Sequence, residues 1–289
     1  MRFAKAHGLG NDFILVAERL APAEIGPWAR RLCDRHRGIG GDGVLLHAPA
    51  PDGVRMRLIN ADGGEAETSG NGLRCLAALA VREGWAPPRH VVHTAPGPRP
   101  VEVTSVGGQR FRIATDLGAP ILGSADIPVA LDPPRAPVLE HPLEVAGRTL
   151  RVTATSLGNP HCAVFLPEPP DDRLLAELGP PLEKHPFFPR RTNVELVTVM
   201  SRSEIRVRFW ERGVGPTQAS GTGSASAAVA SILNGLADRR VRVVCDGGVL
   251  EVEWPEDGHV HQTGEVEVLF EGRWVASTWR DPPALPGRQ

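Results

Sequence analysis

Two copies of one short pattern hold the residues best suited to chemistry. Ser69-Gly70-Asn71-Gly72 and Ser220-Gly221-Thr222-Gly223 each close a glycine-rich turn and open a run of small apolar residues that is typical of a buried helix. The first turn of a helix offers unpaired backbone N–H groups and the positive end of the helix dipole, so it binds carboxylates and phosphates. Two such turns that face each other can hold one carboxylate between them and place a serine hydroxyl on each face of the adjacent carbon atom.

The same two serines also suit a simpler role. Serine is a preferred N-cap residue, because its hydroxyl oxygen accepts a hydrogen bond from a free N–H group of the first helical turn. One copy of the pattern would favour capping alone, whereas two copies favour a ligand site, and a serine can fill both roles at once. A second pair of loops, Gly10-Asn11-Asp12-Phe13 and Gly158-Asn159-Pro160-His161, repeats at an offset of 148 (158 − 10), close to the offset of 151 (220 − 69) between the serines. The sequence therefore predicts two related halves, one after the other, with a cleft between them.

The helices that must position the serines are expected over 73–82 and 224–233, and neither has a polar face. Arg74 is the only charged residue of the first helix before Arg82, and the second helix has none. A helix that is apolar on every side must be enclosed by protein. We therefore expect an α+β fold of two pseudo-symmetric domains, each a curved, mostly antiparallel sheet wrapped around a central buried helix. The active site is expected in the interdomain cleft.

Short apolar and alternating segments predict the strands of both halves. They are 1–16 (two strands about a glycine turn), 54–59, 91–92, 101–103 and 111–113 in the first half, and 152–155, 163–166, 194–199, 205–210, 241–244, 249–254 and 266–270 in the second. A helix is expected over 25–33, followed by a glycine-rich loop over 37–43. A proline-rich passage, 120–137, joins the halves. We predict one domain from 1–117 plus about 268–289 and another from 118–267, with a loose end over 282–289.

The bulk composition excludes several classes of function. The chain has 289 residues, 41% of them hydrophobic, and a formal net charge of −2, so no basic excess is available to hold a nucleic acid or an anionic membrane. No apolar run approaches the ~20 residues that span a bilayer, and the first residues lack the apolar segment of a signal peptide, which predicts a cytoplasmic protein. The sequence does not give the oligomeric state, and a homodimer is one hypothesis.

The four cysteines, Cys33, Cys75, Cys162 and Cys245, show neither C-x-x-C spacing nor histidine partners at metal-ligand spacing. The sequence therefore predicts buried, unreactive thiols, with no structural metal and no disulfide framework.

Seven segments in order carry a resemblance to the diaminopimelate epimerase family, and the match as a whole runs from residue 3 to about residue 272. They are Lys5-x-His7-Gly8-Leu9-Gly10-Asn11-Asp12-Phe13, Asp34-Arg35-His36-x-Gly38-Ile39-Gly40-x-Asp42-Gly43, Asn60-x-Asp62-Gly63, Gly70-Asn71-Gly72-x-Arg74-Cys75, Gly158-Asn159-Pro160-His161, Glu211-Arg212-Gly213-x-Gly215-x-Thr217 and Gly221-Thr222-Gly223. The wider superfamily includes proline racemases, which resemble C-G-H-G at the first helix. Asn71 stands there instead and indicates the diaminopimelate branch.

The resemblance implies a cofactor-independent and metal-independent isomerase that interconverts LL- and meso-diaminopimelate, in lysine and peptidoglycan-precursor biosynthesis. In this family two thiols act on opposite faces of the α-carbon of a small dicarboxylic amino acid. Ser69 and Ser220 occupy those two positions and are the implied catalytic residues. The implied substrate-binding residues are Asn11, Asn60, Gly70, Asn71, Asn159, Asn193, Glu211, Arg212, Gly221 and Thr222.

The resemblance also implies how these residues share the substrate. Gly70, Asn71, Gly221 and Thr222 would supply backbone donors to the reacting carboxylate and stabilise its enediolate-like form. Arg212 would grip the distal carboxylate, a geometry that the guanidinium fork serves well. Glu211 and the asparagines would bind the ammonium groups and fix the handedness of the distal centre.

The two serines depart from the family. A free thiol titrates near pH 8.5, and lower at a helix N-terminus, whereas a serine hydroxyl is far harder to ionise. No histidine is adjacent to either serine in sequence, although His7 and His161 lie in glycine-asparagine loops that could approach the cleft or could bond the loop backbone instead. Cys75 cannot replace Ser69, because six residues of helix separate them by about 9 Å.

Three interpretations of the double serine stay open. It is a laboratory substitution of the two cysteines, a natural isomerase that uses hydroxyl groups and acts on diaminopimelate or another amino acid, or an amino-acid-binding protein that has lost the chemistry. Thr68, Gln218 and Ser224 also differ from the residues usual beside the cysteines, which favours natural divergence.

Overall fold

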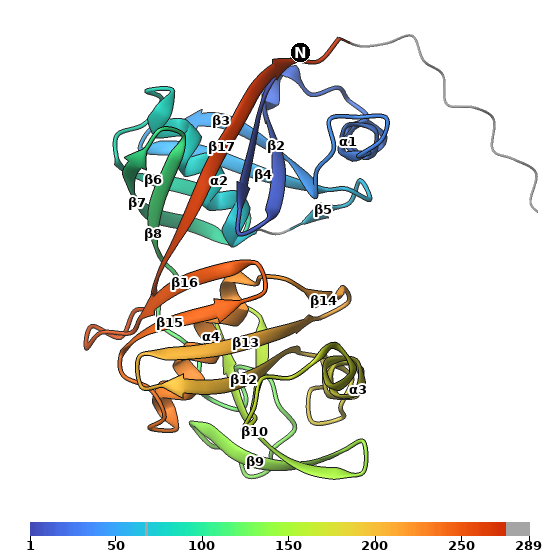
Figure 1. The fold of residues 1–289 in the computed structure, drawn as a ribbon, viewed down its shortest axis with the longest axis vertical. Helices are drawn as coiled ribbons and strands as arrows, with labels where there is room; N and C mark the ends of the chain where they lie inside the picture. Colours follow the sequence, from blue (N-terminus) through green and yellow to red (C-terminus); the bar gives the residue numbers. More distant parts are fainter. Residues whose placement is uncertain (67–68, 276–289) are drawn as a thin grey trace, which may run out of the picture.

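The computed structural model describes residues 1–66 and 69–275, and it places them in two lobes stacked end to end (Figure 1). The elements of the first lobe are β1 (Arg2–Gly8), β2 (Asn11–Ala17), η1 (Glu18–Leu20), α1 (Ile25–Cys33), β3 (Gly43–Ala50), β4 (Gly53–Asn60), β5 (Glu65–Ala66), α2 (Gly70–Arg82), β6 (Arg89–Thr94), β7 (Gly97–Gly107) and β8 (Arg110–Asp116). Those that follow are β9 (Val138–Val145), β10 (Arg148–Ser156), β11 (Pro160–Phe165), α3 (Asp172–Glu183), β12 (Asn193–Ser201), β13 (Glu204–Glu211), β14 (Gly215–Thr217), α4 (Gly221–Leu233), β15 (Arg240–Cys245), β16 (Gly248–Glu253) and β17 (His261–Arg273).

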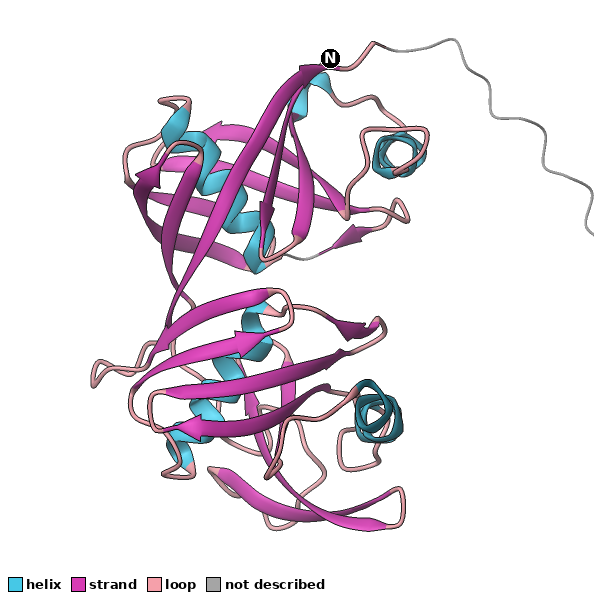
Figure 2. Cartoon of the chain, viewed as in Figure 1, coloured by secondary structure: helices cyan, strands magenta, loops and turns pink. Residues whose placement is uncertain are grey.

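The first lobe is a closed barrel around helix α2 (Figure 2). Its strands follow the order β1-β2-β3-β4-β6-β7-β8-β17, and the barrel closes because β17 pairs with both β8 and β1. Only the β2–β3 and β4–β6 pairs are parallel, so the sheet is mostly antiparallel. The closing strand comes from the far end of the described chain, after the whole second lobe.

The second lobe has an equivalent strand order around helix α4, β9-β10-β11-β12-β13-β15-β16-β17, although among the described residues β9 does not pair with β17 to close it. The repeat extends to single residue pairs. In the parallel β4–β6 pair Val54 lies opposite Val92, and in the parallel β13–β15 pair Ile205 lies opposite Val243, an offset of 151 on both strands (205 − 54 and 243 − 92). The predicted α+β class, with two similar halves that each enclose a helix, is confirmed.

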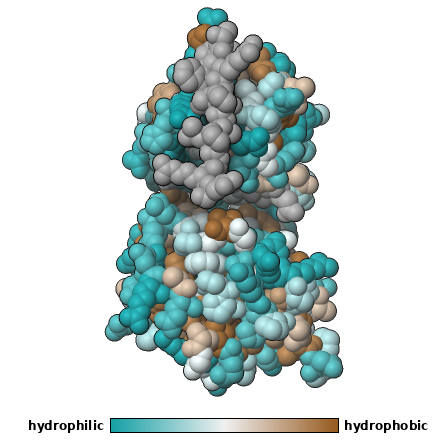
Figure 3. Space-filling model, turned by 90° about the vertical axis from the view of Figure 1, so that its right-hand side faces the viewer, coloured by the Kyte–Doolittle hydropathy of each residue, from teal (hydrophilic) through white to brown (hydrophobic). Residues whose placement is uncertain are grey.

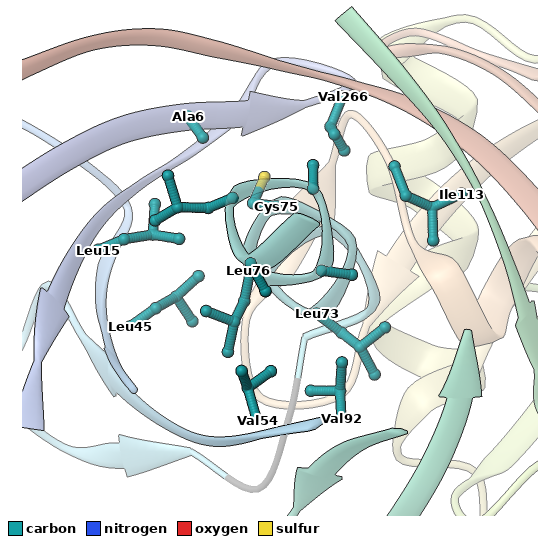
Figure 4. Close-up of a cluster of buried hydrophobic side chains, with 14 of the residues drawn as sticks. Ala6, Leu15, Leu45, Val54, Leu73, Cys75, Leu76, Val92, Ile113 and Val266 are labelled. Atoms are coloured by element: carbon teal, nitrogen blue, oxygen red, sulfur yellow. The ribbon is translucent and has the colours of Figure 1, made fainter. Parts of the chain in front are cut away.

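The core of the first lobe surrounds α2 on all sides (Figure 4). Leu15, Leu45, Val54, Val92 and Ile113 come from five different strands and pack with the helix in one cluster of buried side chains. The residues of α2 that meet them are small where the barrel is tight: Ala77, Ala78 and Ala80 are fully buried. Burial of each larger side chain contributes ~1.5–3 kcal/mol, so this cluster rather than helix propensity holds α2 in place.

Both central helices begin three residues earlier than predicted. Ser69 and Ser220 are their N-caps, and the glycines that follow form the first helical turn. The predicted ends are confirmed: Gly84 (φ 70°) and Gly235 (φ 69°) adopt the left-handed conformation just beyond each helix, which glycine accepts without strain. The motif glycines therefore belong to the helix termini themselves.

Helix α3 and strands β3 and β9 were not predicted, and prolines explain all three omissions. Pro180 and Pro181 stand in the second half of α3, whose first turn is fixed by the Asp171 carboxylate accepting from Leu174 N–H at 2.7 Å. Pro49 of β3 lies beyond the stretch that pairs with β2, and Pro142 lies in β9, which pairs with β10 alone. At each of these prolines the strand pairs with a neighbour on one side only, so the missing N–H group does not interrupt hydrogen bonding to a second strand.

The predicted domain limits near 117 and 268 remain predictions; the second of them falls within β17, which pairs with strands of both lobes. Residues 276–289, which include the predicted loose end, lie outside the described residues. Among the described helices, none has the length and the apolar character needed to cross a bilayer. In the view of Figure 3, hydrophilic residues dominate the surface of the second lobe and apolar ones are scattered among them.

The glycine-rich loop after α1 is held by the last turn of that helix. The backbone N–H groups of Ile39 and Gly40 both donate to Leu32 O at 2.9 Å. Gly38 lies so close to the helix end that a Cβ atom there would stand 2.2 Å from Arg31 O and 2.6 Å from Leu32 O. Glycine is therefore required at this position by space, and the loop it permits leads directly into the cleft.

Gly38→Ala is expected to lower the free energy of unfolding by about 3 kcal/mol, because backbone atoms must move to admit the methyl group. Urea unfolding at neutral pH measures the loss. Gly84→Ala is the control: nothing lies within 4 Å of its Cβ position, so only its φ of 70° costs energy, about 1 kcal/mol. Equal losses in the two variants would contradict the steric argument.

Candidate active site

A cavity of about 430 Å³ lies between the lobes, within the size range of small-molecule sites. Every residue predicted as catalytic or substrate-binding lines it. The lining includes Asn11, Asn60, Ser69, Gly70, Asn71, Asn159, Asn193, Glu211, Arg212, Ser220, Gly221 and Thr222. The two halves of the sequence thus contribute to one site.

The N-termini of α2 and α4 meet in this cavity. A Cβ atom built on Gly70 would lie 3.5 Å from the Cα atom of Gly221, and the converse distance is also 3.5 Å. These distances correspond to van der Waals contact between the two helix ends. Two positive helix ends therefore converge on one small volume, which is an anion-binding arrangement.

Both serine hydroxyls cap their helices in the same geometry. Ser69 Oγ accepts from Gly72 N–H and Ser220 Oγ accepts from Gly223 N–H, each at 3.2 Å. The backbone angles agree as well, with φ −134° at both serines. Capping and a place in the cavity therefore coexist at both positions.

The surroundings of the two serines differ in charge. The carboxylate of Glu211, the last residue of β13, interacts with the side chain of Ser220. Burial raises the pKa of Glu211, and the interaction with Ser220 opposes that rise. In the first lobe the corresponding last residue of β4 is Asn60, a neutral amide. Only the Ser220 side of the pseudo-symmetric pair thus has a proton acceptor at this position.

A charged network supports the asparagines of the first lobe. Asn11 Nδ2 donates to Asp42 Oδ2 at 2.6 Å, and Arg35 bridges Asp42 and Asp12 with distances of 2.8 and 2.6 Å. Buried Lys5 pairs with Asp12 at 2.6 Å. Burial alone would raise the pKa of Asp12, but the hydrogen bonds from Arg35 and Lys5 outweigh it and hold that pKa well below its usual range. The network fixes Asn11 at the rim of the cavity.

A second buried group supports the asparagines of the second lobe. His161 Nδ1 lies 2.7 Å from Glu195 Oε1, and His161 Nε2 lies 3.0 Å from Asn159 Oδ1. Burial raises the pKa of Glu195, and the charge of His161 opposes the rise. Asn193 donates to Pro160 O at 2.9 Å and accepts from Arg212 N–H at 3.0 Å. His161 therefore acts on the lining through Asn159.

His7 and the cysteines take no part in the lining of the cavity. His7 Nδ1 accepts from Gly10 N–H at 3.4 Å, a bond to the backbone of its own loop. All four cysteines are free and buried, and burial raises the pKa of Cys75 to about 12. Over the described ranges, no three His, Cys, Asp or Glu side chains converge on a metal-sized space.

Five polar lining residues were not predicted: Asp42, Arg74, Arg99, Thr115 and Gln262. Arg74 had a signal, as the single charge on an otherwise apolar helix, and Asp42 lies in a quoted loop segment. Arg99 and Gln262 are single residues on strands β7 and β17, and only the three-dimensional fold brings them to the cleft.

Comparison with known proteins shows the family to which the chain belongs. The family profile described as diaminopimelate epimerase matches residues 3–122 and 153–269. The diaminopimelate epimerase of Desulforudis audaxviator is 46% identical over 280 residues, which cover 95% of this chain and 99% of that protein. The diaminopimelate epimerase of Pelotomaculum thermopropionicum is 44% identical over 283 residues, covering 96% of this chain and 100% of that protein.

Solved structures share the fold at low identity. A Pseudomonas aeruginosa protein described as a predicted epimerase has a TM-score of 0.68 and 18% identity, over 96% of this chain and 99% of that one. A hydroxyproline epimerase from Agrobacterium vitis has a TM-score of 0.64 and 14% identity, over 94% of this chain and 90% of that one.

Proposed function

Since this chain belongs to the diaminopimelate epimerase family, we propose that it binds diaminopimelate in the cleft and interconverts the LL and meso forms. The observation that carries the proposal is the convergence of two helix N-termini, each led by a serine, on one cavity. One carboxylate fits between the helix ends, and its α-carbon then lies between Ser69 and Ser220. The reaction belongs to lysine and peptidoglycan-precursor biosynthesis.

The proposed reaction removes one proton from the α-carbon and adds another to the opposite face. A base on one face takes the α-proton, the C–H electron pair moves toward the carboxylate to form an enediolate, and an acid on the other face returns a proton to the carbon. Backbone N–H groups of the two helix ends stabilise the charge that develops on the carboxylate oxygens. This is an electrostatic contribution of the fold, and it is independent of which atoms act as bases.

NMR in D₂O tests the proposal directly. LL-diaminopimelate is incubated with the chain, and the loss of the α-proton signal and the appearance of the meso form are followed together. Exchange with inversion supports the epimerase. If calorimetry shows that diaminopimelate binds but NMR shows no exchange, the proposed binding site is supported and the proposed reaction is contradicted. Exchange of a different amino acid but not of diaminopimelate would point to another racemase on this scaffold.

The caps give specific support to a second candidate, a binding protein that has lost turnover. Each serine oxygen already accepts a helix N–H bond at 3.2 Å, and a hydroxyl is a weaker proton acceptor than a thiolate. The carboxylate-binding helix ends do not depend on the serines. Diaminopimelate would then bind with ordinary affinity and keep its α-protons.

Arg212→Ala is expected to weaken diaminopimelate binding by ~10–100-fold, because a hydrogen bond to a charged partner contributes ~1.5–3 kcal/mol. Within the described chain Arg212 pairs with no carboxylate, and its Nη1 donates only to Arg190 O at 3.2 Å. Its guanidinium is thus available to a ligand. Calorimetry with lysine, which lacks the second carboxylate, is the control: lysine binding should be equal in the two proteins. Unchanged diaminopimelate affinity would remove Arg212 from the site.

A further inference from the structure

Arg74 is a buried cation at the centre of the molecule. It lies in the second turn of α2, its side chain is fully enclosed with 1% of the residue exposed, and the helix residues between it and Arg82 are apolar. Burial lowers the pKa of Arg74 to about 10, which leaves it charged at neutral pH. Burying a charge is costly unless it is paired.

No carboxylate among the described residues pairs with this charge. Arg74 Nη1 donates to Gln262 Oε1 at 2.9 Å, and Nη2 donates to the side-chain oxygen of Asn71. Its Nε is buried and has no partner. Both partners are neutral amides, so they satisfy hydrogen bonds and leave the positive charge uncompensated.

The charge lies directly behind the meeting point of the two helix ends. A Cβ atom on Gly70 would be 3.7 Å from Arg74 Nη1, and Arg74 itself lines the cavity. Gln262 connects the guanidinium to the other lobe, because its Nε2 donates to Gly221 O at 2.7 Å. Arg74, Gln262 and Gly221 form a bridge from the first turns of α2 to the start of α4.

We propose that Arg74 is a carboxylate-recognition residue, whose missing counter-charge is the reacting carboxylate of the ligand. This inference rests on the proposed function and adds to it a residue outside the implied sets of catalytic and substrate-binding residues. The carboxylate gains negative charge as it becomes enediolate-like, so a fixed cation stabilises that state more than the ground state. The Gln262 bridge keeps the cation aligned with both helix ends.

The test compares two variants on two ligands. Arg74→Met keeps the length and apolar bulk of the side chain and removes the charge. Arg82→Met is the matched control, because Arg82 is in the last turn of the same helix and bonds Glu83 and Gln109 instead. The ligands are diaminopimelate and its α-carboxamide, which keeps the shape and loses the charge of one carboxylate. Calorimetry gives the four affinities, and thermal melting shows that each variant is folded.

Arg74→Met is expected to weaken diaminopimelate binding ~100-fold, from the Coulomb interaction of unit charges several ångströms apart in a protein environment. Its affinity for the carboxamide is expected to change less than ~3-fold, and Arg82→Met to leave both affinities unchanged. Equal loss for both ligands would show that Arg74 only supports the structure and would overturn the inference.

A second probe separates this inference from the proposed function. If the unaltered chain binds no diaminopimelate, but succinate raises its melting temperature and does not raise that of Arg74→Met, the charge site stands and the assigned substrate falls. If diaminopimelate binds equally well to both proteins, the proposed substrate stands and the Arg74 inference falls. If neither diaminopimelate nor succinate binds the unaltered chain, both fall.

Discussion

Replacing Ser69 and Ser220 together by cysteine is expected to raise the rate of α-proton exchange by ~10²–10⁴-fold, the usual contribution of a well-matched acid–base group. A thiol with a pKa near 8.5 supplies a useful fraction of thiolate at pH 8, and the N-terminus of a helix lowers that pKa further. Both serines stand at such N-termini, so the thiols would meet the same helix dipoles. Exchange of LL-diaminopimelate in D₂O, followed by NMR for both proteins under identical conditions, measures the ratio.

The single variants show which face limits the reaction. Ser69→Cys is expected to give the larger gain. The first-lobe counterpart of Glu211 is Asn60, a neutral amide, so this position offers Ser69 no carboxylate to take its proton. An unaltered chain that already exchanges as fast as the double variant would contradict the expectation, and hydroxyl groups would then suffice as bases. If the double variant stayed inactive while binding diaminopimelate, the pocket geometry and not the serine chemistry would be at fault.

Glu211→Gln is expected to slow α-proton exchange by ~10²-fold in the unaltered chain. The carboxylate interacts with the Ser220 side chain, so we expect it to take the hydroxyl proton as Ser220 receives the one from the substrate. The amide has the same shape and cannot do this. The comparison is made at saturating diaminopimelate, so that weaker binding does not contribute to the loss.

The pH profile gives an independent signature of the same group. Burial raises the pKa of Glu211, and the proton acceptor is the ionised form, so the exchange rate should rise with pH through that raised pKa. Glu211→Gln should lose this rise. His161 and Glu195 are the other titratable groups whose charges act here, and both remain in the variant.

The cysteine background is the control for Glu211. A thiol ionises without a neighbouring carboxylate, so Glu211→Gln should cost much less when residue 220 is cysteine. An equal loss in both backgrounds would assign Glu211 to binding of a substrate ammonium group alone. The two predictions are therefore best measured as one set of four proteins.

The candidate site could be predicted from the sequence because its residues lie where glycine-rich loops meet helix ends and strand ends. Ser69 and Ser220 are recognisable by the helices they begin, and Asn60 and Glu211 by the strands they end. Gln262 had no such signal, because its role depends on β17 crossing between the lobes. Whether a buried charge is paired depends on which residues surround it in three dimensions. The sequence alone therefore does not show that Arg74 lacks a carboxylate partner among the described residues.

The fold itself could be predicted where local pattern and tertiary packing agree. Helix α1 has the predicted bounds, Ile25–Cys33. Its apolar side chains recur at helical spacing, and they pack against the outer side of the barrel. The sequence does not predict helix α3 because Pro180-Pro181 opposes a helix locally, whereas burial of Leu175, Leu178 and Leu182 in the core of the second lobe stabilises it. Tertiary contacts outweigh local propensity in that element.

Strand β17 imposes an order on the folding of the two lobes during synthesis. The barrel of the first lobe closes only when Arg2 pairs with Arg273 and Lys5 with Phe270, so its edge stays open while the ribosome makes the whole second lobe. The strands from β9 to β16 are all available before that closure. Domains commonly fold in the order of their synthesis, but here the half that is made first is the half that is completed last.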